Sequence, residues 1–146
     1  MYLKERLVEI GDEQSQRKTI QIMGNKFANL KGNGVTLYGE RMCLHKLDVV
    51  IHDNKIQKCK KEALIFKNII IRDLQITQNQ IFNNNGNGIS IQRVHSYEDH
   101  PFLLSENTCN KSGGAFGIYL YDTWCDVLDC ETSSNSHGGI IIIGSK

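Results

Sequence analysis

The sequence lacks several features that would point to common protein classes. Its formal net charge is only +1, so no excess of one sign favours nucleic acid or an anionic membrane as a partner. The apolar run at residues 140–143 has the length of a strand and is far short of the roughly 18 residues of a membrane span. The N-terminus is charged within its first six residues and has no apolar core of a signal peptide. We therefore expect a cytoplasmic protein that binds neither nucleic acid nor membrane.

The cysteines show no disulfide or zinc pattern. There are five of them, an odd number, and none form a CxxC pair. Cys125 and Cys130 are five residues apart, which is not a usual zinc spacing. We interpret them as reduced thiols of an intracellular protein, some of them core residues, and we expect no metal and no cofactor.

The composition favours short strands and tight turns. The 146 residues suit one domain, and 40% hydrophobic and 23% charged residues exclude a disordered chain. Thirteen Gly stand beside a single Pro, and the chain also contains 18 Ile and 13 Asn. Ile fills pleated, buried strands, whereas Asn and Gly fill turns that need positive φ.

Five segments repeat one pattern, which aligns into columns. Two inward columns, two residues apart, open each segment: Ile20, Val49, Leu74, Phe102 and Cys125, then Ile22, Ile51, Ile76, Leu104 and Val127. A turn column follows, made of Asn25, Asn54, Asn79 and Asn107, with Cys130 in the fifth place. A later inward column holds Val35, Leu64, Ile89, Ile118 and Ile140, spaced by 29, 25, 29 and 22 residues. The last inward column, two residues further on, holds Leu37, Phe66, Ile91, Leu120 and Ile142.

These columns predict an all-β, right-handed parallel β-helix of about five rungs, each rung with about three short strands. The period-2 spacing indicates strands with one buried face, and a repeat of this length indicates a stacked architecture. No helical period fits between the strands. We expect the Asn column to form a ladder, because Asn tolerates the left-handed region and can hydrogen-bond to the next rung.

The pattern Asn-x-Ile-x-x-Asn-x-x-x-x-Gly-Ile-x-Ile, seen between Asn79 and Ile91, resembles the parallel β-helix repeat. That repeat occurs in pectin-degrading enzymes, in periplasmic copper-maturation proteins and in the β-helix region of F-box and SH2-binding scaffold proteins. The resemblance implies a pectin-lyase-like fold, which hosts both enzymes and binding proteins.

The two ends differ from the repeats. Residues 1–19 form a predicted N-terminal cap, with Leu3, Leu7 and Ile10 at the spacing of a short amphipathic helix. Residues 20–146 form the repeats. The sequence stops soon after the apolar strand 140–143, so we expect either a fragment of a longer β-helix or another chain that covers this end.

His137 is the sharpest catalytic candidate. The segment from Ser136 to Ser145 resembles the Gly-His-Gly segment of polygalacturonases, which implies a supporting catalytic role for His137. Those enzymes also need paired carboxylates, one to protonate the leaving group and one to activate water. Asp126 and Asp129 are candidates, but they lie on the same rung as His137 instead of the preceding one. A calcium-dependent lyase is disfavoured, because the outward positions of the first strand hold a single carboxylate.

Two polar loops form a second candidate site. The predicted loop 93–101 contains His95, Tyr97 and His100 with two carboxylates, a set that could bind a partner, hold a metal or perform acid–base chemistry. The predicted loop 39–46 projects from the same corner, so the two could form one binding edge.

The outward columns end in an apolar patch. One column is Thr36, Ile65, Ser90, Tyr119 and Ile141, and the next is Tyr38, Lys67, Gln92, Tyr121 and Ile143. Their last members, Tyr119, Tyr121, Ile141 and Ile143, indicate a partner interface, a surface covered by the same chain, or a platform for stacking sugars.

Together these patterns favour a non-catalytic scaffold or binding module that contacts other polypeptides at its C-terminal rung. The family resemblance suggests roles in ubiquitin ligases or on the cytoskeleton. The alternative is a carbohydrate-active enzyme of the polygalacturonase type or a polysaccharide-binding module.

Overall fold

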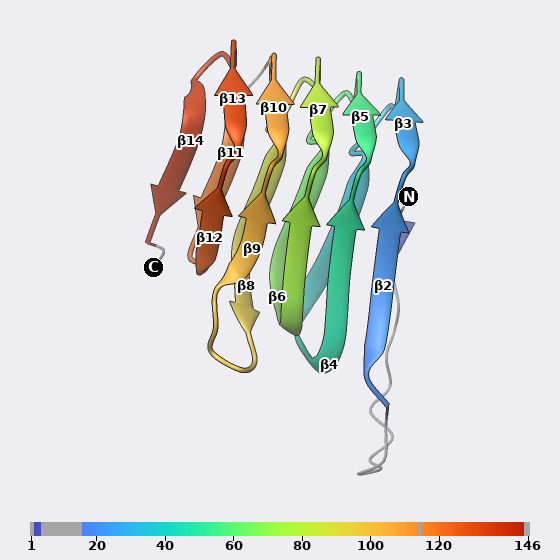
Figure 1. The fold of residues 1–146 in the computed structure, drawn as a ribbon, viewed down its shortest axis with the longest axis vertical. Helices are drawn as coiled ribbons and strands as arrows, with labels where there is room; N and C mark the ends of the chain where they lie inside the picture. The colour runs from blue at the N-terminus through green and yellow to red at the C-terminus, as the bar shows by residue number, and fades with distance from the viewer. Residues whose placement is uncertain (1, 4–15, 114, 145–146) are drawn as a thin grey trace.

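A computed structural model describes residues 2–3, 16–113 and 115–144, and every regular element in them is a strand (Figure 1). The strands are β1 (Tyr2–Leu3), β2 (Lys18–Met23), β3 (Lys26–Ala28), β4 (Val35–His52), β5 (Lys55–Gln57), β6 (Leu64–Thr77), β7 (Gln80–Phe82), β8 (Ile89–Ser96), β9 (Phe102–Ser105), β10 (Thr108–Asn110), β11 (Phe116–Tyr121), β12 (Cys125–Leu128), β13 (Glu131–Ser133) and β14 (Gly138–Ile143). These residues include no helix long and apolar enough to cross a membrane.

The strands form a parallel β-solenoid of about five turns, as the sequence predicts. The short strands pair in the order β13-β10-β7-β5-β3, and Figure 1 shows them side by side along the top of the view. The larger sheet follows the order β1-β4-β6-β8-β11-β14, with β2 paired to β4 and with β9 joining β6 to β12. Each strand therefore lies beside its equivalent in the next rung.

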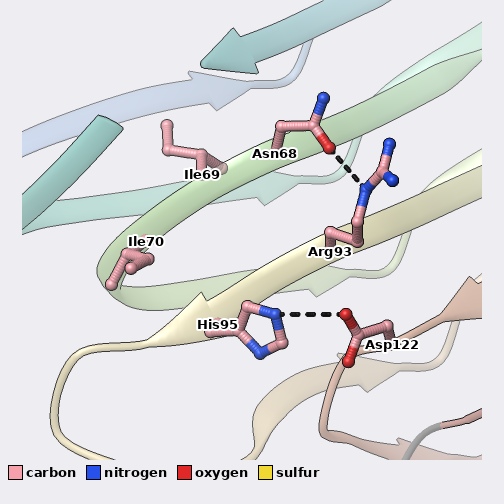
Figure 2. Close-up of a pocket in the computed structure, with 6 residues that line it drawn as sticks. All are labelled: Asn68, Ile69, Ile70, Arg93, His95 and Asp122. Carbon is pink, nitrogen blue, oxygen red and sulfur yellow. Dashed lines mark hydrogen bonds and ion pairs between the residues drawn. The ribbon is translucent and has the colours of Figure 1, made fainter. Parts of the chain in front are cut away.

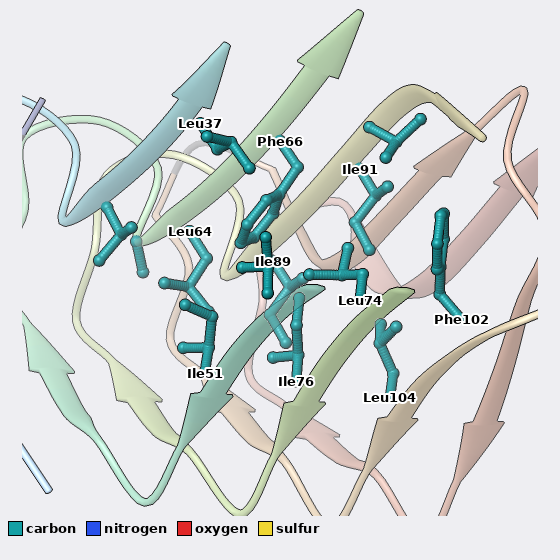
Figure 3. Close-up of a cluster of buried hydrophobic side chains, with 14 of the residues drawn as sticks. Leu37, Ile51, Leu64, Phe66, Leu74, Ile76, Ile89, Ile91, Phe102 and Leu104 are labelled. Carbon is teal, nitrogen blue, oxygen red and sulfur yellow. The ribbon is translucent and has the colours of Figure 1, made fainter. Parts of the chain in front are cut away.

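The predicted inward columns form the core. Ile20 pairs with Val49, and Val49 with Leu74, which matches the first column. Figure 3 shows the side chains of successive rungs stacked inside the solenoid. Ile51, Leu64 and most other members of the middle rungs are fully buried. Stacking like residues on like residues buries each apolar side chain between two neighbours, which is the main stabilising contribution in such a fold.

The chain turns at three corners, and residues with positive φ occupy the same place in successive rungs. The first corner has Gly24, Asp53, Gln78, Glu106 and Asp129; the second has Asn29, Lys58, Asn83, Lys111 and Ser134; the third has Asn68, Arg93, Asp122 and Gly144. Their φ values, between +49° and +64°, lie in the left-handed region. The expectation that the Asn column itself is left-handed is wrong, because the residue before each Asn takes that conformation.

The Asn ladder forms as predicted. The Oδ1 atoms of Asn54, Asn79 and Asn107 each accept the backbone N–H of the Asn one rung earlier, at 2.9, 3.0 and 3.1 Å. Each Nδ2 donates to a backbone carbonyl of the preceding rung, at 2.7, 2.9 and 2.6 Å. At the fifth position the Cys130 thiol lies 3.6 Å from the Leu104 carbonyl oxygen. The ladder therefore has a structural role, since it bonds the buried backbone at the corner.

Two local expectations are wrong. Residues 39–46 are not a loop but part of β4, where Cys43 pairs with Ile70 of β6. The pairing of β4 with β6 is irregular between Tyr38 and Met42 and between Leu44 and Asp48, so the chain turns at these two places without leaving the sheet. Ser90, expected to face solvent, is fully buried, because this small residue lies between Ile65 and Tyr119 in the ladder.

The N-terminal cap falls mostly outside the described residues. Tyr2 and Leu3 form β1, which pairs with β4 instead of starting a helix. The remainder of the expected helix, residues 4–10, is not among the residues that the structure describes. The first repeat strand starts at Lys18, two residues before the predicted boundary.

Candidate functional site

The last rung, made of β12, β13 and β14, exposes side chains that belong to inward columns. Ile140 pairs with Ile118, and Ile142 pairs with Leu120. Ile118 and Leu120 are 0% and 1% exposed, whereas Ile140 is 44% and Ile142 54% exposed. No rung lies beyond β14 among the described residues, so these two side chains lack a neighbour on one side. We call this surface the open C-terminal rung.

The predicted outward patch lies beside it. Tyr119 pairs with Ile141, and Tyr121 with Ile143, so the four residues occupy two adjacent strands. Tyr121 and Ile143 are exposed, whereas Tyr119 and Ile141 are half-buried. The structure thus brings together all four residues that the sequence singles out for this patch.

The backbone of β14 is also available at this end. Among the described strands β14 pairs with β11 alone, so the other edge of residues 138–142 presents N–H and C=O groups without a strand partner. Such an edge can accept a further strand. Apolar side chains and backbone groups are therefore presented together at the open C-terminal rung.

A separate pocket of about 360 Å³, lined by both polar and apolar side chains, lies at the third corner (Figure 2). Arg93 Nε donates a hydrogen bond to Asn68 Oδ1 at 2.6 Å. His95 Nε2 lies 3.6 Å from Asp122 Oδ2, and both side chains are about half exposed. Ile69 and Ile70 complete the lining. A guanidinium beside a histidine could hold a small anion here, but the Asp122 carboxylate opposes that charge.

Asn68 and Asp122 are not among the candidate residues predicted from the sequence. With Arg93, they occupy the equivalent corner position of three successive rungs, one residue after the aligned outward column. Extending the alignment by one position would have placed them together, because they follow the same repeat spacing as the strands.

The histidines and tyrosine of the predicted loop 93–101 do not form one cluster. His95 lies on β8, and Tyr97 is 59% exposed with its ring 5.3 Å from the His45 ring. This contact joins the two segments predicted to share an edge. His100 Nε2 lies 4.0 Å from Glu98. No group of three metal-ligating side chains occurs among the described residues.

In the structure His137 interacts with Ser136 and with the Phe116 ring. The exposed His137 precedes β14, with Nδ1 3.1 Å from Ser136 Oγ and its ring 6.0 Å from the Phe116 ring. Asp126 lies on β12, and Asp129 lies at the first corner. In the described part of the chain no hydrogen bond or ion pair joins His137 to either carboxylate.

Comparison with known proteins adds no further assignment. No family model matches the chain, and neither curated proteins nor solved structures give a match.

Proposed function

We propose that this chain is a non-catalytic β-helix module, of the pectin-lyase-like kind, that binds another polypeptide at its open C-terminal rung. The observation that carries the proposal is the exposure of Ile140 and Ile142 in columns that are buried everywhere else in the stack. The ladder of stacked Asn residues supports the fold assignment. The five free cysteines support a role in a reducing compartment such as the cytoplasm.

The mode of binding follows from the rung itself. A partner strand that lies parallel to β14 satisfies its backbone edge and places apolar side chains over Ile140 and Ile142. Complete burial of one such side chain contributes about 1.5–3 kcal/mol, so covering the two half-exposed residues supplies about that amount in total, roughly a fifth to a third of a micromolar affinity. Tyr121 and Ile143 extend the contact outward. This is strand addition, in which the backbone gives affinity and alternate side chains give specificity.

A labelled strand peptide tests the proposal. The probe has the sequence of β11, Phe116–Tyr121, with terminal lysines for solubility and a fluorophore. We expect saturable binding by fluorescence anisotropy, and we expect Ile142→Lys to abolish it, because the lysine places a charge where the partner's apolar side chain packs. Tyr38→Lys is the matched control: Tyr38 is 52% exposed but lies in the rung at the other end. Equal loss in both variants, or no binding to the wild type, would contradict the proposal.

A further inference from the structure

Among the residues that the structure describes, the first and last rungs of the solenoid carry opposite charge. The first described rung, residues 16–34, contains Arg17, Lys18, Lys26 and Lys31 and no carboxylate. The last rung contains Asp126, Asp129 and Glu131, and residues 112–144 hold no lysine or arginine. All seven of these charged residues are exposed. The formal charge of the whole chain hides this separation.

Residues at the two ends that complement each other lie on the same ladder, that is, the same row of residues paired from strand to strand. One outward ladder runs from Lys26 through Lys55, Gln80 and Thr108 to Glu131. A second runs from Met23 through His52, Thr77 and Ser105 to Leu128. Its terminal members are both exposed hydrophobic residues, at 49% for Met23 and 52% for Leu128. The first ladder therefore ends in opposite charges, Lys26 and Glu131. The second ends in two apolar side chains, Met23 and Leu128.

The Asn ladder has matching ends as well. Each buried Asn accepts a backbone N–H from the preceding rung, but Asn25 has no preceding corner among the described residues, and its side chain is exposed. At the other end the ladder stops at Cys130. A preceding rung that ended in Cys130 would place its backbone N–H at Asn25 Oδ1, as in every other step of the ladder.

We propose that the polypeptide bound at the open C-terminal rung is the N-terminal end of a second copy of this chain, stacked head to tail. This inference rests on the proposed function. It places β12 beside β2 and β13 beside β3 of the next copy, and β14 pairs with β4 of the next copy in the place that β1 fills in the single chain. Glu131 then lies opposite Lys26, and Leu128 lies opposite Met23. Because the contact joins two different surfaces along one axis, it does not close on itself and continues into a filament.

Charge exchange tests the pairing of the two ends. Lys26→Glu and Glu131→Lys change exposed side chains, and each should lower the association constant in analytical ultracentrifugation roughly three- to tenfold at low salt. The double variant, with both changes in one chain, restores opposite charges across the contact and should associate as the wild type does. A double variant that stays as weak as the single variants would overturn the proposal.

Disulfide trapping tests the direction of stacking. The variant Met23→Cys with Leu128→Cys is made in a Cys43→Ser background, since Cys43 is exposed. Laddered residues of adjacent parallel strands lie about 5 Å apart, which suits a disulfide. Mild oxidation should give a series of linked dimers, trimers and longer species, whereas each single cysteine variant stops at dimers.

Different results would contradict the proposed function and the head-to-tail stacking. Peptide binding at β14 with neither charge rescue nor a disulfide series means that the open C-terminal rung binds another protein and that head-to-tail stacking is wrong. Absence of peptide binding counts against the proposed function itself.

Discussion

At the scale of the residue, Asn79 shows how one side chain joins three rungs. Its Oδ1 accepts the Asn54 N–H at 3.0 Å, and its Nδ2 donates to the Ile51 carbonyl at 2.9 Å and to Asn107 Oδ1 at 2.9 Å. The residue is fully buried, so no water replaces these bonds if they are lost.

We predict that Asn79→Ala lowers the free energy of unfolding by about 2–4 kcal/mol, because it leaves buried backbone groups without partners. The matched control is Asn25→Ala, at the exposed end of the same ladder, which should cost less than about 1 kcal/mol. Urea unfolding followed by circular dichroism measures both. Similar losses in the two variants would show that the ladder contributes no more than a surface hydrogen bond does.

The thiols provide a second residue-scale prediction. Burial raises the pKa of Cys125 from 9.0 to about 11, whereas Cys43 is exposed. The folded state therefore favours the protonated thiol, and the stability that this gives is present below pH 9 and is lost as the pH rises toward about 11. Over that range the wild type should lose more free energy of unfolding than Cys125→Ala does.

The rate of alkylation at pH 8 measures the same difference between the exposed and the buried thiols. Cys43 should react rapidly, and Cys125 and the buried Cys109 slowly, since burial also raises the pKa of Cys109. Modification of Cys125 as fast as Cys43 in the folded protein would contradict the burial of this thiol.

At the scale of the element, the three-residue strand β7 tests which side chains of a strand face the core, here called the strand phase. Ile81 is fully buried between Ile56 and Cys109, whereas Gln80 is exposed beside Lys55. Ile81→Asp places an unpaired charge in the stack and should unfold the domain or cost at least about 3 kcal/mol. Gln80→Asp should stay within about 0.5 kcal/mol of the wild type, because its carboxylate remains in solvent near a lysine. Thermal unfolding of the two variants distinguishes the faces, and equal effects would mean that the strand phase is wrong.

The sequence predicts the elements well where side chains determine the structure. Ile20, Val49 and Leu74 align by hydrophobicity alone, and they pair in that register because a shift by one residue would turn the apolar side chains out of the core. The patch of Tyr121 and Ile143 follows from the same alignment.

The missed features depend on the backbone. Left-handed Gln78, Arg93 and Lys111 carry no strong sequence signal, because these residue types favour no particular turn. The third corner, with left-handed Asn68, Arg93 and Asp122, lies beside residues 39–46 of β4 and brings Asp122 near His95. Hydrophobic spacing records neither placement.

At the scale of the whole molecule, each rung is held by its neighbours, so a terminal rung has half the support of an internal one. Ile89 and Ile91 of β8 are fully buried between β6 and β11. Ile140 and Ile142 belong to β14, which pairs with β11 alone among the described strands. The stack is therefore expected to open from its C-terminal end before it unfolds as a whole.

Native-state hydrogen exchange measures this gradient. We predict that amides of β14 exchange through local opening, with a free energy several kcal/mol below that of β8 amides, which exchange only through global unfolding. Raising the protein concentration should slow exchange in β14 while leaving β8 unchanged, because a stacked copy supplies the missing neighbour of the last rung. The Glu131→Lys variant, which weakens stacking, should shift this effect to higher concentration. Equal exchange free energies for β14 and β8 in dilute solution would show instead that the solenoid unfolds as one cooperative unit.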